Sequence, residues 1–162
     1  MPDSKRLRIL KALTAHLENI TPANGYNHDL TGAVFRGRDQ FGSKDPIPMV
    51  SILEYLRPDQ QEDRPSNQNK NRENWHLLIQ GFVSDDYQNP TDPAHGLLAD
   101  VKKSLAEIRD ETSPVYRLGN KLIADLYMDG GIVRPPDEAS AKATFYLRVI
   151  IDFVEYTHDP YE

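Results

Sequence analysis

The stretch ATFYLRVIIDFVEY, residues 143–156, decides how the rest of the chain must fold. Every second position in it is strongly apolar, at Phe145, Leu147, Val149, Ile151 and Phe153. Because successive side chains of a strand point to opposite faces, these five would share one buried face of a sheet. We therefore predict one long strand over this range. Its other face would carry Tyr146, Arg148, Ile150, Asp152 and Val154.

Three earlier segments are also predicted to be strands, namely AVFRGR (33–38), PMVSILEYL (48–56) and NWHLLIQGFV (74–83). In the third, Trp75, Leu77 and Ile79 would lie on one face. A fifth strand is expected within KLIADLYMDGGIVR (121–134), whose first half is compatible with helix or strand. Its paired glycines and the RPP sequence that follows favour extended backbone for the second half.

Two amphipathic helices are predicted. The first spans residues 4–20, begins at a cap by Asp3 or Ser4, and has the apolar stripe Leu7, Leu10, Leu13, Leu17 and Ile20. The second begins at Asp92 as the cap, with Pro93 at its first position, and runs to about residue 111. Its stripe is Leu97, Leu98, Val101, Leu105 and Ile108. Together these elements predict an α+β fold, a mostly antiparallel five-stranded sheet packed with two helices.

The 162 residues are expected to form a single domain, 1–162, interrupted by one polar loop. The loop, RPDQQEDRPSNQNKNRE at 57–73, has no apolar residue in seventeen positions. Such a segment gains too little from burial to offset its ordering entropy, so we expect it to be mobile in the isolated chain. A polar loop of this length is also a typical place for partner contacts.

Composition excludes several classes of function. The net charge of -6 at pH 7 is opposite to that of a general nucleic-acid binder or of a protein drawn to an anionic membrane. The absence of cysteine excludes disulfides, thiolate nucleophiles and cysteine metal sites, and suits a reducing cytoplasm. The charged N-terminal sequence does not have the pattern of a signal peptide.

One stretch is close to a phosphate-binding loop, since Gly37 and Gly42 are five apart and are followed by Ser43 and Lys44. A phosphate-binding loop needs the lysine before the hydroxyl residue and a helix directly after both. Here that order is reversed, and the following DPIP sequence is incompatible with a helix. We interpret the segment as an ordered, proline-fixed connection between two strands.

No catalytic or metal-binding constellation is evident. The five histidines do not pair at the spacing of metal ligands on one element; they are His16, His28, His76, His95 and His158. Asp85 and Asp86 end the third strand, where a solvated strand end is the simpler interpretation. We therefore predict no catalytic residue, no cofactor and no metal.

Arg36 and Arg38 flank Gly37 at the end of the first predicted strand. Strand alternation would place both guanidinium groups on the same face. Two hypotheses follow, a clamp for a phosphate or a partner's carboxylate and a solvated strand end with a salt bridge.

In its order of elements the chain resembles the tail terminator (tail completion) proteins of tailed bacteriophages, the minor tail protein U type. The resemblance rests on an N-terminal helix, VFRGR, DPIPMVSILEY, a polar loop, WHLLIQGFV, a helix, the GGIVRPPDE turn and FYLRVIIDFVEY. It implies a non-enzymatic subunit that forms a homohexameric ring in the virion, having been assembled in the host cytoplasm. The ring would end growth of the tail tube and face the head–tail connector proteins, with DNA passing through unbound.

Two alternatives stay open, a head–tail connector (neck adaptor) protein and a small metal-dependent enzyme that would use Asp85, Asp86 or His95. For the ring, we expect partner contacts at Arg36, Arg38, Phe41, Lys44, Arg57, Arg64, Lys70 and Arg72. Acidic residues are expected along the lumen because they repel DNA. The candidates are Asp85, Asp86, Asp129 and Glu138.

Overall fold

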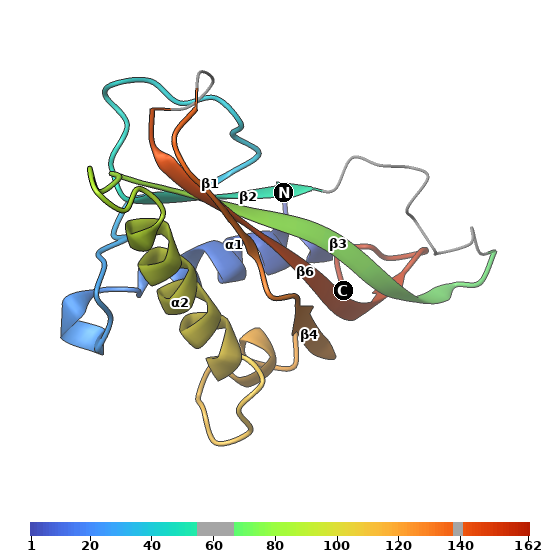
Figure 1. Cartoon of the computed structure of the whole chain (residues 1–162). Helices are drawn as coiled ribbons and strands as arrows, with labels where there is room; N and C mark the ends of the chain where they lie inside the picture. The colour runs from blue at the N-terminus through green and yellow to red at the C-terminus, as the bar shows by residue number, and fades with distance from the viewer. Residues whose placement is uncertain (55–66, 138–140) are drawn as a thin grey trace.

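A computed structural model describes residues 1–54, 67–137 and 141–162, and shows an α+β fold (Figure 1). Its sheet runs in the order β1 (Val34–Arg36), β2 (Met49–Glu54), β3 (Lys70–Val83), β6 (Ala143–Tyr156) and β4 (Asp125–Met128), with β5 (Ile132–Arg134) also paired to β6. Only β1 and β2 are parallel, so the prediction of a mostly antiparallel sheet is confirmed.

The predicted number of strands was wrong, because six strands are present in the described chain instead of five. The segment 121–134 contributes two short strands, β4 and β5, which pair one after the other along the same edge of β6. A turn separates them, in which Asp129 Oδ1 accepts the Gly131 N–H at 3.0 Å.

The long strands β3 and β6 form the centre of the sheet and pair over their whole length, from Lys70 opposite Tyr156 to Val83 opposite Ala143. The polar loop was predicted to extend to residue 73, but Lys70–Glu73 belong to β3. The reason is that β6 is long enough to supply a backbone partner for each of these polar residues. Residues 55–66 lie outside the described parts of the chain.

Both helices pack on the same face of the sheet (Figure 1). Helix α1 (Lys5–Glu18) has Ser4 as its N-cap, whose hydroxyl accepts the Leu7 N–H. The predicted stripe needs one correction, since Leu7 is 36% exposed and Ile9 is buried in its place. The helix is rotated slightly from the predicted orientation, so that Ile9, Leu13 and Leu17 face the sheet.

Helix α2 (Asp92–Glu107) carries the predicted stripe, and all five of its apolar residues are buried. Its bounds differ from the prediction. Thr91 is the N-cap, Asp92 is the first helical residue, and the helix ends at Glu107 instead of near 111. Neither α1 nor α2, the helices of the described residues, has the length and apolarity that a membrane span requires.

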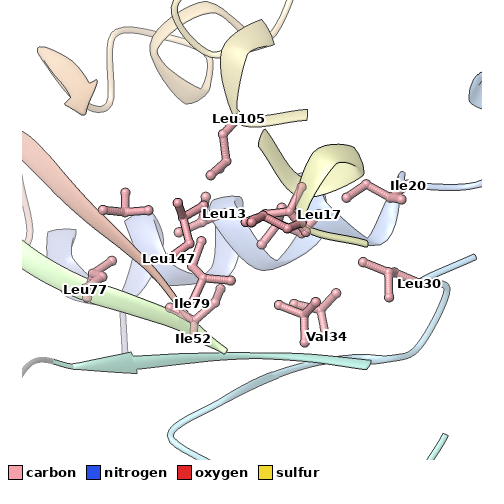
Figure 2. Close-up of a cluster of buried hydrophobic side chains, with 14 of the residues drawn as sticks. Leu13, Leu17, Ile20, Leu30, Val34, Ile52, Leu77, Ile79, Leu105 and Leu147 are labelled. Atoms are coloured by element: carbon pink, nitrogen blue, oxygen red, sulfur yellow. The ribbon is translucent and has the colours of Figure 1, made fainter. Parts of the chain in front are cut away.

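The hydrophobic core lies between the helices and the sheet, as Figure 2 shows. Leu13 and Leu17 of α1 and Leu105 of α2 meet Ile79 and Leu147 of the central strands, and all five are fully buried. Burial of each such side chain stabilises the fold by about 1.5–3 kcal/mol relative to exposure. This layer covers one face of the sheet and leaves the opposite face for other contacts.

Candidate functional site

One face of the sheet is turned away from both helices, and we call it the open face. A row of three side chains crosses its centre. Ile150 of β6 lies between His76 of β3 and Tyr127 of β4 in the strand register. Ile150 and His76 are half-buried, and Tyr127 is 45% exposed. The centre of the open face is therefore apolar and aromatic, and accessible.

Three arginine–aspartate pairs surround this centre. Arg148 Nε lies 2.8 Å from Asp129 Oδ2, and Arg72 Nε lies 2.9 Å from Asp152 Oδ1. The third pair joins Arg109 Nε and Asp125 Oδ1 at 3.3 Å. We call the set Arg72, Arg109, Tyr127, Arg148 and Ile150 the arginine-rimmed patch.

In each pair the aspartate is more buried than the arginine. The contrast is greatest for Asp152, whose side chain is 3% exposed, and Arg72, whose side chain is 71% exposed. Hydrogen bonding to Asp152 raises the pKa of Arg72. Each carboxylate thus holds one arginine side chain in place, and the three arginine side chains remain 50–71% exposed.

Asp152 and Asp125 are cross-strand neighbours, a placement that would be repulsive for two bare carboxylates. Each is neutralised by an arginine from a different element, Arg72 of β3 and Arg109 after α2. The Arg109 guanidinium also lies 5.6 Å from the centre of the Tyr127 ring, a cation–π distance. Tertiary structure alone brings these five groups together.

Asp129 has a similar anchoring role at the other end of the patch. Burial would raise the pKa of this carboxyl, but hydrogen bonds from the Arg148 side chain and from the N–H groups of Arg148 and Gly131 lower it on balance. The ionised Asp129 therefore fixes both the β4–β5 turn and the direction of Arg148.

A cleft of about 920 Å³ adjoins the patch on the open face. The loop after β1 forms one wall, where Phe41 packs on Phe82 with ring centres 4.5 Å apart. Tyr146 lies in the floor and its hydroxyl accepts a hydrogen bond from Gln80 Nε2 at 3.2 Å. The cleft mixes apolar, acidic and basic lining, with no concentration of one chemical type.

Protein–protein contact surfaces are enriched in aromatic residues and arginine, and the arginine-rimmed patch has that composition. Among residues 1–54, 67–137 and 141–162, no group of three His, Cys, Asp or Glu side chains could hold a metal ion. His95, considered for metal-dependent chemistry, is exposed on α2, and Asp85 and Asp86 are exposed on the turn after β3.

The prediction that Arg36 and Arg38 share a face was wrong. Arg36 Nη1 donates to Thr14 Oγ1 of α1 at 2.9 Å, on the helix-covered side. Arg38 stacks on Phe35 and Phe41 of the open face, at 4.5 and 5.4 Å from the ring centres, and pairs with Asp45 at 2.8 Å. Gly37 between them has a φ of +70°, which breaks the alternation of the strand.

The other predicted partner-contact residues are dispersed. Phe41 is half-buried on the wall of the cleft, and Lys44 is exposed on the same loop. Lys70 is exposed at the start of β3, 5.7 Å from the Tyr156 ring centre. Of the six that the structure describes, only Arg72 belongs to the arginine-rimmed patch. Arg57 and Arg64 lie outside the described residues.

The predicted lumen acids also separate. Asp85 and Asp86 are exposed and adjacent, whereas Asp129 is engaged with Arg148 about the β4–β5 turn. Glu138 lies outside the described residues.

Two of the five histidines have structural roles inside the fold. His16 Nε2 donates to the Ser104 carbonyl at 2.7 Å, which joins α1 to α2. His28 Nδ1 lies 2.7 Å from Asp100 Oδ2, and not against the adjacent Asp29. His28 and Asp100 fix the loop before β1 onto α2.

Sequence reasoning missed most of the patch. Alternation along β6 did place Arg148, Ile150 and Asp152 on one face, which was the only available signal. Tyr127 and Arg109 come from other elements, and nothing local in the sequence relates them to β6.

The sequence matches no protein-family model, and no curated protein matches it.

Proposed function

We propose that this chain is a structural subunit of a tailed bacteriophage, which assembles as a homohexameric ring at the head-proximal end of the tail tube and ends its growth. The observation that carries the proposal is the arginine-rimmed patch, which lies on a sheet face that no described helix covers. The order of elements on which the resemblance rests agrees with it.

The physical support is the way the patch is made. Guanidinium groups held by carboxylates that are more buried than they are lose little side-chain entropy when a partner binds, and arginine and tyrosine dominate the energetics of contact surfaces. A surface prepared in this way is expected of a subunit whose task is assembly.

The partners in this proposal are copies of the chain, the tail tube protein and the head–tail connector proteins, and the location is the virion neck. We assign the chain no catalytic step and no cofactor. DNA would pass through the ring, and each copy brings a net charge of -6, which disfavours binding of phosphates to the ring.

Electron microscopy tests the proposal. Purified chain should form closed rings, and antibodies to the chain should label the head-proximal end of tails isolated from particles that lack heads. A head–tail connector protein would instead remain on heads that lack tails. A chain that stays monomeric and labels neither structure would contradict both roles.

A further inference from the structure

The turn after β3, residues 84–92, is the acidic counterpart of the arginine-rimmed patch. Between residues 73 and 101 the sequence has no lysine and no arginine. The turn exposes three carboxylates, Asp85, Asp86 and Asp92, and Tyr87 is 98% exposed. We call residues 84–92 the acidic turn.

The acidic turn has a fixed shape. Asp86 Oδ1 accepts the N–H groups of Gln88 and Asn89 at 2.9 and 2.8 Å, and the Asp92 N–H donates to the Asn89 carbonyl at 3.1 Å. Tyr87 therefore projects into solvent from an ordered backbone, so little further ordering is needed when its ring is buried by a partner.

The acidic turn and the patch occupy different parts of the length of β3, since the patch lies beside its first half and the turn follows its last residue. Arg72 is near the start of this strand, and the acidic turn begins directly after Val83 at its end. At about 3.3 Å per residue, the end of β3 lies roughly 35 Å from Arg72 and roughly 17 Å from Arg148, which is opposite Leu78. A single copy cannot bring the two surfaces together, whereas two copies can.

We propose that the acidic turn of one copy docks on the arginine-rimmed patch of the next copy. Tyr87 would cover the apolar centre at Ile150 and Tyr127, while Asp85 and Asp86 would approach the arginine rim. This contact rests on the proposed function, in which copies of the chain assemble, and assigns Asp85 and Asp86 to subunit contact instead of the lumen.

The chemistry of the two surfaces is complementary. A guanidinium group has five N–H donors, and Arg72 directs its Nε and Nη2 toward Asp152 while its side chain stays 71% exposed. A second carboxylate can approach the outer edge of such a group in the bidentate geometry that arginine favours. Because the two surfaces differ, the contact is head-to-tail, the type that gives a ring when the rotation between successive copies closes.

A charge-exchange experiment tests the contact by sedimentation velocity at about 0.1 M salt, where the Debye length is still ~10 Å. One variant changes the acidic turn, Asp85→Lys with Asp86→Asn, where asparagine keeps the oxygen that fixes the turn. The other changes the rim, Arg109→Glu with Arg148→Glu, and leaves Arg72 in place above buried Asp152. We expect each variant alone to assemble roughly tenfold more weakly than the unchanged chain, or worse.

Mixing the two variants should restore assembly. In an alternating ring, the changed turn meets the changed rim and the original turn meets the original rim, so attraction returns at every contact. A misfolded variant would not be rescued in this way. Tyr87→Ala should also weaken assembly, whereas Tyr161→Ala, a matched change at another exposed tyrosine, should not.

If both variants assemble alone as the unchanged chain does, or if mixing fails to rescue variants whose circular dichroism spectra match that of the unchanged chain, the contact is overturned while a ring made through other surfaces remains. If mixing rescues assembly but the product is not a closed ring on tails, the contact stands and the proposed function fails. An unchanged chain that never assembles overturns both.

Discussion

The ring of Phe145 occupies the space that any side chain at Gly81, its cross-strand partner, would need. A Cβ placed on Gly81 would lie 2.0 Å from Phe145 Cε1. Phe145 is fully buried, so its ring has no free space into which to move. The absence of a side chain at Gly81 of β3 is thus a condition for the packing of Phe145, one of the two buried phenylalanines of β6.

We expect Gly81→Ala to destabilise the fold by about 1–3 kcal/mol or more, because the added methyl group overpacks the core. Urea denaturation followed by circular dichroism measures this change. Gly42→Ala is the matched control, since the nearest atom to its added Cβ is Asp45 Oδ2 at 3.9 Å, and it should leave the midpoint nearly unchanged. Equal midpoints for the two variants would contradict this account of Phe145.

Arg72→Ala should lower the thermal midpoint more than Arg148→Ala does. The first change leaves the Asp152 carboxylate, 3% exposed, without its arginine, whereas the second leaves Asp129 at 33% exposure, where water solvates it. Adding Asp152→Asn to the Arg72→Ala variant should recover part of the loss, because the buried charge is removed. Differential scanning calorimetry at neutral pH decides the order, and the reverse order would show that Arg72 does not compensate this carboxylate.

The free energy of unfolding should fall between pH 10 and pH 12 because the Tyr26 hydroxyl ionises. Burial, together with the hydrogen bond from its hydroxyl to Glu107 Oε1 at 2.8 Å, raises the pKa of Tyr26 from 10.0 to about 12. Because the pKa of Tyr26 is higher in the folded state, its stabilisation of the fold is complete at pH values below the pKa of the unfolded chain. This stabilisation is lost as pH rises through the folded-state pKa of about 12.

The comparison is therefore with Tyr26→Phe, which should be less stable by about 0.5–1.5 kcal/mol near neutral pH because one hydrogen bond is lost. The difference in free energy of unfolding should narrow steadily from pH 10 to pH 12. Tyr161→Phe, at an exposed site, provides the control. A difference that stays constant over that interval would mean that Tyr26 does not contribute to the alkaline loss.

The connection between α2 and β4 contains backbone strain that a substitution can relieve. Lys121 has a φ of +54° and Asn120 has a φ of +51°, in the left-handed region. Lysine is strained there, whereas asparagine tolerates it. Lys121→Gly should stabilise the fold by about 0.5–1 kcal/mol, and Asn120→Gly by less. Urea midpoints check the ranking, and a lowered midpoint for Lys121→Gly would exclude strain at this residue.

The sequence by itself determined the main elements and the buried faces of the central strands. The alternation in residues 143–156 and the helical spacing of α2 follow from the geometry of a strand and of a helix, which depends on near neighbours in the chain. Predictions from local sequence were wrong where one residue interrupted the strand. Gly37 did so with its φ of +70°, which placed Arg36 and Arg38 on opposite sides of the sheet. They also failed where a long partner strand paired polar residues, as β6 did for Lys70–Glu73.

Only the tertiary structure decided the arginine-rimmed patch. Arg72, Arg109, Tyr127 and Arg148 come from four separate parts of the sequence, and the register of β3 and β4 on β6 and the position where α2 ends bring them together. Register is set by burial of the whole apolar face against both helices, since a shift of one residue would turn every core side chain outward. The arginine-rimmed patch is thus a consequence of core packing on the opposite side of the sheet, which no local pattern in the sequence encodes.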